Sequence, residues 1–542
     1  MALPSKILGI DRKRGADALV RALVAAKVRR VFTLSGNHIM PVFDAAIGAG
    51  VELIHVRHEA AAVHMADAWA RITGEVGVAL VTGGPGHANA VAALYTASMA
   101  ESPVVLFSGH APLGELGMGA FQEMKQAEIA APLAKESWTS ASADSIAGDV
   151  ERAIASAKGG RPGAVHVSLP SDALEREMGS RPAPGRRAAE LPPSFDPEPF
   201  LERLKRAKRP LILTGPASMT KAGRQRMAKL EAACGIPVVG MESPRGIADS
   251  SLGEFPQMLA QADCILLLGK RLDFTLKFGR APALAAECEF LQIDAEASET
   301  ERTRRAAGAR LRIAALASPF DAAEAMMPAL RKQRIKSAWL GEVRAAIAER
   351  PAAWSKAKSK LPGRLHPVQA LRPLQAILDS NPESVFVSDG GEFGQWAQAC
   401  LSAPHRVING VAGAIGPALP FAVAARIAKP DAPVIAVMGD GTFGFHPAEI
   451  DTAVRYKLPF VAIVGNDARW NAEYQIQLRE YGAERALGTE LLPTRYDEVA
   501  KGFGGFGELV TDASKLAAAA KRALASRKPA VLNVMIEGLA AP

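Results

Sequence analysis

The sequence has few cysteines, and those few show no pattern. Among 542 residues there are four, at Cys234, Cys264, Cys288 and Cys400, with no paired spacing. This argues against a disulfide framework and against a zinc knuckle, and it is typical of a reducing compartment. We therefore expect a cytoplasmic protein.

Long apolar runs are also missing. No run approaches the length of a membrane span, and the N-terminus lacks the apolar core of a signal peptide. The net charge is +8, but the basic residues are dispersed and no nucleic-acid-binding motif appears. We expect neither a membrane nor a nucleic-acid partner. A solvated Arg-rich surface explains the charge, and attraction of anionic substrates or cofactors is the alternative.

Short apolar runs alternate with helical patterns along the whole chain. This alternation predicts an α/β fold of three doubly wound parallel-sheet domains, at 1–180, 190–335 and 360–542. A Pro/Arg-rich linker over 180–199 and a polar connection with an exposed helix over 331–364 separate them. The predicted buried strands are 30–34, 76–82, 103–108, 161–170, 210–215, 236–240, 264–269, 290–294, 385–388, 434–438, 460–464 and 530–536.

Two acids follow two of these strands in the third domain. Asp440 lies between Gly439 and Gly441 after one strand, and Asp467 follows the next strand 27 residues later. In parallel sheets ligands bind at the carboxyl ends of strands, so both acids are expected at one edge. Two carboxylates, a diphosphate and a water make a Mg²⁺ site, and glycines let backbone N–H groups approach phosphate oxygens.

This arrangement resembles the signature of thiamin diphosphate-dependent enzymes, and the resemblance extends over almost the whole chain. It implies that Asp440 and Asp467 bind the metal, with Asn466 as an alternative ligand and the backbone carbonyl of Arg469 completing the set. It also implies an apolar wedge beneath the cofactor at Ile415. The other cofactor contacts that it implies on this side are Gly391, Glu392, Phe393, Gly413, Gly439, Gly441 and Thr442.

The resemblance places the activating group in the first domain. Glu59 opens a predicted helix over 58–74 and matches the family's Glu that bonds the pyrimidine ring of thiamin, which prepares the C2 carbon by proton transfer. A helix N-terminal acid facing the macrodipole is the alternative role. Asn89 matches an Asn in the family's glycine-rich turn, and Gln122, with Phe121 as a wall, matches a Gln that lines the active site. An exposed polar helix is the alternative for Gln122. In this family the two halves meet across a homo-oligomer interface.

The family makes or breaks a C–C bond next to a carbonyl. His38, 21 residues before Glu59, and Gln122, 63 after it, follow the pattern of benzaldehyde lyase, in which a His relays a proton. The segment 443–459 is similar to 2-hydroxyacyl-CoA lyases. These details favour a lyase or carboligase acting on an aldehyde or a 2-hydroxyacyl-CoA, although a capping or core role remains the alternative for His38.

Three further alternatives stay open or are set aside. The first is an acetolactate synthase-like enzyme, which would pass an acetyl unit from pyruvate to a second 2-keto acid. The second is a silent regulator of the same fold, which the presence of Glu59 and Asp440 disfavours. A dehydrogenase is disfavoured because no GxGxxG follows a strand.

The ligand of the central domain is left undecided between FAD and an ADP or CoA group. Four residues of that domain are the candidates for an ADP moiety, and a solvated basic loop is the alternative for the cations. They are Arg271, Lys277, Arg280 and Asp294.

Overall fold

A computed structural model describes residues 13–179, 195–332, 334–335 and 337–542. The predicted linker over 180–199 therefore lies outside the described residues except for its last five positions. The chain divides into two compact units, Met1–Ala189 and Glu190–Pro542. The first unit holds one sheet and the second holds two.

All strands of the first sheet run parallel, in the order β2-β1-β3-β4-β6-β5. The two faces of a strand carry alternate side chains. Accordingly, Val78 and Leu80 pack with α1 (Gly15–Ala25) and α6 (Ile146–Lys158), whereas Phe32 contacts Trp69 of α3 (Glu59–Thr73). The strands are β1 (Arg30–Thr33), β2 (Glu52–His55), β3 (Gly77–Val81), β4 (Val104–His110), β5 (Glu136–Thr139) and β6 (Ala164–Pro170).

The second unit repeats this architecture twice, again with parallel pairing throughout. One sheet has the order β11-β10-β9-β7-β8, with strands β7 (Pro210–Thr214), β8 (Val238–Gly240), β9 (Cys264–Leu268), β10 (Glu289–Asp294) and β11 (Leu311–Leu316). The other has the order β13-β12-β14-β15-β17-β16, with β12 (Val385–Ser388), β13 (His405–Ile408), β14 (Val434–Gly439), β15 (Val461–Asn466), β16 (Phe506–Val510) and β17 (Ala530–Met535).

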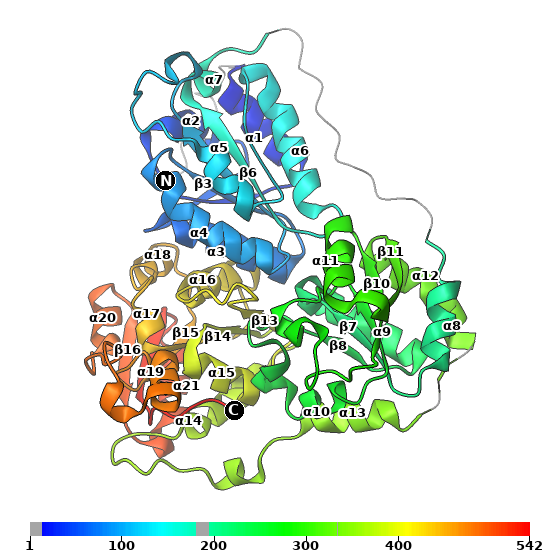
Figure 1. Cartoon of the computed structure of the whole chain (residues 1–542). Coiled ribbons are helices and arrows are strands. Elements are labelled where there is room, and N and C mark those ends of the chain that lie inside the picture. The colour runs from blue at the N-terminus through cyan, green and yellow to red at the C-terminus, as the bar shows by residue number, and fades with distance from the viewer. Residues whose placement is uncertain (1–12, 180–194, 333, 336) are drawn as a thin grey trace. The chain divides into compact units, whose positions relative to one another are not determined.

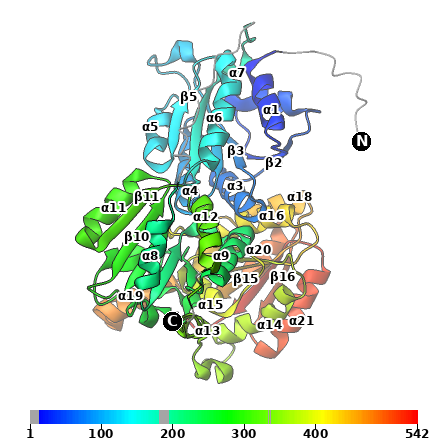
Figure 2. The ribbon, with the colours of Figure 1, turned by 90° about the vertical axis from the view of Figure 1, so that its right-hand side faces the viewer.

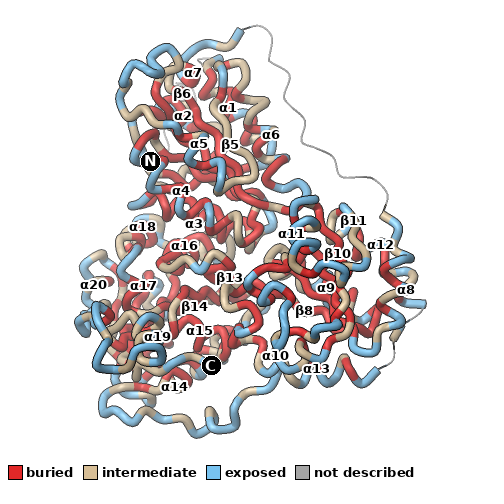
Figure 3. The backbone as a smooth tube through the Cα atoms, viewed as in Figure 1, coloured by how far each residue is buried: buried red, intermediate tan, exposed pale blue. Residues whose placement is uncertain are grey.

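Helices flank each sheet (Figures 1 and 2), and the central strands form the buried interior (Figure 3). The predicted α/β fold with three parallel sheets is thus confirmed. The domain boundaries at 1–180, 190–335 and 360–542 stay a prediction.

One helix differs from its prediction. The helix expected to be exposed within 331–364 is α13 (Trp339–Ala348), and its residues Trp339 and Val343 are buried. Both join the apolar core beside the second sheet, and the Trp339 indole N–H donates to the Pro210 carbonyl at 2.9 Å. The polar composition of the segment concealed this buried face.

All four cysteines carry free thiols, so no disulfide forms. Within the described ranges, no helix has the length and apolar character needed to span a bilayer.

Candidate functional site

A cavity of about 170 Å³ in the second unit collects nearly all the residues predicted for the cofactor's metal and diphosphate. It lies at the carboxyl ends of β14 and β15, where doubly wound sheets bind ligands. Of the twelve residues predicted on this side, only Asn466 is not among its lining. The predicted residues that line it are Gly391, Glu392, Phe393, Gly413, Ile415, Gly439, Asp440, Gly441, Thr442, Asp467 and Arg469.

Helix starts converge on this cavity. The first three residues of α15 (Gly391–Cys400) and of α19 (Asn471–Tyr481) line it, as does the short helix α17 (Asp440–Phe443). The first N–H groups of a helix lack intrahelical partners and carry partial positive charge. The cavity is therefore suited to the oxygens of a diphosphate.

Two neighbouring strands bring the two acids to one place. Gly439 of β14 pairs with Gly465 of β15, so Asp440 and Asp467 follow at adjacent strand ends. Both carboxyl groups are buried, with side chains in residues only 2% and 8% exposed. Burial raises the pKa of both above the usual aspartate value, and the charge of Asp440 raises the pKa of Asp467 further.

These acids fit a divalent cation. Within the described part of the chain, Asp440 Oδ2 is buried and has no hydrogen-bond partner. Its lone pairs are therefore available to a cation. No group of three or more His, Cys, Asp or Glu suited to a metal occurs among the described residues. Oxygens from backbone and diphosphate would have to complete the set, as is usual for Mg²⁺.

Bare backbone is required beside the acids. A Cβ on Gly441 would lie 2.6 Å from the Trp470 ring, and a Cβ on Gly465 would collide with the ring of Phe393. Trp470 and Phe393 are themselves cavity walls. The lack of a side chain at Gly441 and Gly465 thus lets the rings of Trp470 and Phe393 pack against the strand ends.

Asn466 is engaged in the protein interior. Its amide donates to the Thr494 carbonyl at 3.0 Å and to Asn533 Oδ1 at 3.1 Å, and its Oδ1 accepts from the Ala468 N–H at 3.2 Å. The residue is fully buried. Its hydrogen bonds join the end of β15 to Thr494 and to Asn533 of β17.

Asp389, which our sequence analysis did not single out, holds two cavity loops together. It is buried at the end of β12 and accepts three backbone N–H bonds, from Gly390 at 2.7 Å, Gly416 at 2.9 Å and Ala418 at 3.0 Å. Burial raises its pKa to about 6, and the three donors oppose that rise. The bonds tie the turn before α15 to the loop that carries Ile415. An acid at the carboxyl end of a predicted strand was the available signal.

In the first unit, Glu59 lies beside Asn89. Glu59 is the first residue of α3 and is 9% exposed, and Asn89 on α4 (Pro85–Met99) donates from Nδ2 to its Oε2 at 3.0 Å. His58 caps the same helix by accepting from the Ala60 N–H at 3.1 Å. The carboxylate is therefore held at a helix start with one oxygen oriented by an amide.

His38 lies near the same turn. Its Nδ1 is 3.2 Å from Thr82 Oγ1, and its ring stacks on that of Phe121 with centroids 6.0 Å apart. Burial lowers the pKa of His38, which favours the neutral imidazole. A neutral ring beside a hydroxyl can pass a proton in either direction.

Gln122 occupies a strained position in the loop between β4 and α5 (Gln126–Ala130). Its φ of 57° is left-handed, and a Cβ on Gly84 would lie 2.7 Å from the Gln122 Cβ. Glu123 shapes the loop by accepting N–H bonds from Gly117, Gly119 and Ala120 at 2.6–3.2 Å.

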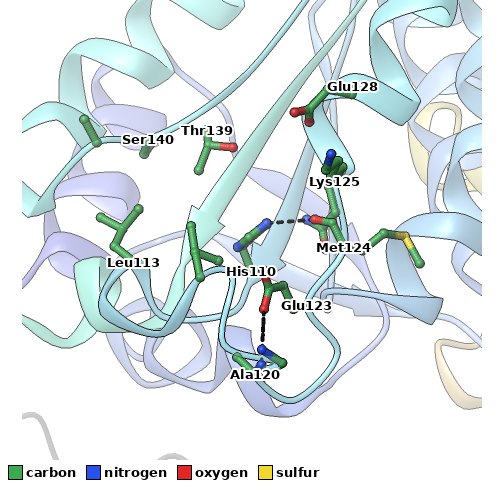
Figure 4. Close-up of a pocket in the computed structure, with 13 residues that line it drawn as sticks. His110, Leu113, Ala120, Glu123, Met124, Lys125, Glu128, Thr139 and Ser140 are labelled. Carbon is green, nitrogen blue, oxygen red and sulfur yellow. Dashed lines mark hydrogen bonds between the residues drawn. The ribbon is translucent and has the colours of Figure 1, made fainter.

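A cavity of about 620 Å³ lies beside this loop (Figure 4). Figure 4 shows His110 reaching across to the Met124 carbonyl, 3.0 Å from its Nε2, while its Nδ1 is 3.0 Å from the Ala111 carbonyl. The contact between His110 Nε2 and the Met124 carbonyl thus links the end of β4 to the C-terminal end of the loop that carries Gln122.

Of the four candidates for an ADP group, only Lys277 and Arg280 line one cavity together. Arg271 pairs with Glu299 at 3.2 Å, and Asp294 accepts from the Glu296 N–H at 3.1 Å. Lys277 and Arg280 instead line a separate cavity of about 660 Å³ together with the half-exposed ring of Phe278.

Comparison with known proteins identifies the family of this chain. Models of three thiamine pyrophosphate enzyme domains match the chain: the N-terminal TPP binding domain at 13–129, the central domain at 198–317 and the C-terminal TPP binding domain at 389–534.

Relatives match over nearly the full length. A "Probable acetolactate synthase" of Mycobacterium bovis is 32% identical over 537 residues, which cover 96% of this chain and 95% of that protein. "2-hydroxyacyl-CoA lyase 2" of Homo sapiens is 30% identical over 97% of this chain and 90% of that protein. "2-hydroxyacyl-CoA lyase" of Oryza sativa is 29% identical over 96% of this chain and 95% of that protein. The chain therefore belongs to the thiamine pyrophosphate enzyme family, as its sequence signature predicted.

Proposed function

We propose that this protein is a thiamin diphosphate- and Mg²⁺-dependent enzyme that cleaves or forms a C–C bond next to a carbonyl. The observation that carries the proposal is the cavity at β14, β15 and α15, which is lined by eleven of the predicted residues, two of them buried acids. When bound, thiamin diphosphate supplies a nucleophilic carbon and an electron sink for such reactions.

In this proposal the second unit holds the cofactor. Asp440, Asp467 and the Arg469 carbonyl bind Mg²⁺, while the starts of α15 and α19 receive the diphosphate. Asn466 keeps its role in the interior, since its side-chain oxygen already accepts a hydrogen bond. Ile415 supports the cofactor from below, and the Gly413 carbonyl accepts from its amino group.

Glu59 of the first unit activates the cofactor through a hydrogen bond to its pyrimidine ring. The Asn89 amide holds one Glu59 oxygen and leaves the other for this bond. His38 moves a proton at the substrate oxygen, and Gln122 orients the substrate. We propose that the two halves come from different copies of the chain in a homo-oligomer in the cytoplasm.

For the substrate we propose a 2-hydroxyacyl-CoA or an aldehyde as the first candidate. Two relatives carry the name 2-hydroxyacyl-CoA lyase, and Lys277 and Arg280 offer positive charge to a CoA phosphate beside the Phe278 ring. The second candidate is an acetolactate synthase-like transfer from pyruvate to a 2-keto acid, favoured by the 32% identity to a probable acetolactate synthase. No feature of the central sheet selects FAD over an ADP group.

One experiment separates these candidates. Purified protein with thiamin diphosphate and Mg²⁺ receives pyruvate in one reaction and a 2-hydroxyacyl-CoA in another, and CO₂ and aldehyde release are followed. Aldehyde without CO₂ supports the lyase, whereas CO₂ with acetolactate supports the synthase. Release of neither product, together with no binding of thiamin diphosphate, would reject the proposed function.

A further inference from the structure

Gln126 is a buried side chain that joins three elements of the first unit. It is 1% exposed and begins α5, four residues after Gln122. Its Oε1 accepts from the Gly84 N–H at 2.8 Å, and its Nε2 donates to the Gly109 carbonyl at 3.0 Å and to Ser168 Oγ at 3.1 Å. Both amide hydrogens and the oxygen are therefore used.

The orientation of this amide is fixed by its partners. A backbone N–H can only donate and a backbone carbonyl can only accept, so the oxygen must face Gly84 and the nitrogen must face Gly109. The alternative orientation would leave two buried backbone groups unpaired. Such groups are costly to bury, so Gln126 keeps its neighbours at fixed positions.

The turn that Gln126 holds lies against two of the unit's catalytic candidates, Glu59 and His38. Gly84 lies between Thr82, which contacts His38, and Gly86, whose added Cβ would lie 3.4 Å from Glu59 Oε1. The turn also opens α4, from which Asn89 donates to Glu59. A shift of Gly84 therefore displaces the surroundings of Glu59 and His38 together.

The hydrogen bond from Gln126 to the Gly109 carbonyl fixes the backbone on another side of His38. A Cβ on Gly109 would lie 2.6 Å from the His38 Cβ, so the Gly109 backbone is a wall against which His38 packs. Gln126 binds that wall through its carbonyl. One side chain thus sets the spacing between the glycine-rich turn and the end of β4, with His38 between them.

We propose that Gln126 is a positioning residue for the reaction, which aligns Glu59 and His38 through the Gly84 turn and the Gly109 backbone. This inference rests on the proposed function. It predicts that Gln126 governs proton transfer at the cofactor and has little influence on how tightly the second unit binds the diphosphate.

The test compares full-length Gln126→Leu with Ser98→Ala. The control removes one hydrogen bond at the far end of α4, where Ser98 Oγ donates to the Leu133 carbonyl at 2.6 Å. Three quantities are measured: amide hydrogen exchange of the 82–86 segment in the apoprotein, affinity for thiamin diphosphate with Mg²⁺, and deuterium exchange at C2 of the bound cofactor.

For Gln126→Leu we expect faster amide exchange at Gly84, cofactor affinity within about 3-fold of wild type, and C2 exchange slowed at least ~10-fold, because a misplacement of about 1 Å can cost ~100-fold. Ser98→Ala should match wild type in all three. Wild-type C2 exchange in Gln126→Leu would overturn the proposal.

If Gln126→Leu does not fold, Gln126→Glu decides the matter. It keeps the shape and the acceptor for Gly84 but replaces the donors to Gly109 and Ser168, so C2 exchange should still be slowed. Unchanged exchange would overturn the proposal. Absence of cofactor binding by the wild-type protein would instead refute the proposed function.

Discussion

The two predicted halves of the site treat their carboxylates in opposite ways. In the second unit, Asp440 and Asp467 are buried together, and Asp440 Oδ2 has no hydrogen-bond partner within the described residues. In the first unit, Glu59 is oriented by the Asn89 amide at 3.0 Å. Two buried carboxylates side by side are unfavourable until a cation binds between them, whereas a single carboxylate oriented by an amide can accept a hydrogen bond from a ligand. The comparison indicates that one half is built for a metal and the other for a hydrogen bond.

The largest effect is expected at the metal half. Asp440→Ala removes a ligand, so Mg²⁺-dependent affinity for thiamin diphosphate should fall by ~100-fold or more, since loss of outer-shell partners alone costs about 10- to 100-fold. Titration calorimetry with and without Mg²⁺ measures it. Asp451→Ala, which removes a surface acid paired with Arg455, is the control. Equal affinity in both variants would remove Asp440 as a ligand.

Glu59→Gln tests the other half and should separate binding from turnover. Cofactor affinity should stay within about 3-fold, while turnover falls by about 10²- to 10⁴-fold, the range for a lost acid–base group. Glu75→Gln changes an exposed acid just beyond the same helix and should have no effect. Normal turnover in Glu59→Gln would show that the residue is only a helix-terminal acid.

His38→Ala should have a smaller effect than Glu59→Gln. We expect turnover to fall toward the lower end of the range for acid–base groups, about 10²-fold, with cofactor affinity unchanged. Steady-state rates of C–C cleavage, paired with cofactor titration, measure this. Turnover equal to wild type would assign His38 a packing role against Phe121.

The smallest effect concerns the apoprotein and its pH dependence. Burial raises the pKa of both Asp440 and Asp467, and repulsion by Asp440 raises that of Asp467 further, so the folded state holds more protons than the unfolded state. The free energy of unfolding should therefore fall as pH rises from about 4 to about 8. Saturating Mg²⁺ should reverse the trend.

Asp467→Asn removes one titrating group of this pair and keeps its shape. Its thermal midpoint without metal should change less with pH than that of the wild type. If the thermal midpoints of the two proteins change equally with pH, the acid pair does not bind the additional proton of the folded state.

The sequence allowed the interior of each sheet to be predicted, but not most of its edges. The strands that were not predicted are β2, β5, β11, β13 and β16, and each lies at the edge of its sheet. An edge strand is covered less completely, so it need not be a continuous apolar run. β5 is wholly intermediate in burial, and β11 has four intermediate and two exposed residues.

The site was predictable where chemistry coincides with strand ends. Asp440 and Asp467 follow apolar runs, and parallel topology then brings them together. Asp389 and Gln126 escaped because their roles are to bond backbone groups of distant loops. The place of Asp389 after an apolar run was a partial signal, but which backbone groups either side chain faces depends on the fold.

At the end of β15, strand geometry gives the adjacent residues Asn466 and Asp467 different surroundings. Successive side chains point to opposite faces, so Asn466 is committed to the interior with Thr494 and Asn533, while Asp467 lines the cofactor cavity. The two adjacent positions are therefore not interchangeable. Replacing Asp467 by Asn would change the charge around the proposed cation. Replacing Asn466 by Asp would instead place a charge among the buried hydrogen bonds to Thr494 and Asn533. In the proposed metal site, position 467 therefore tolerates a change between Asp and Asn that position 466 does not.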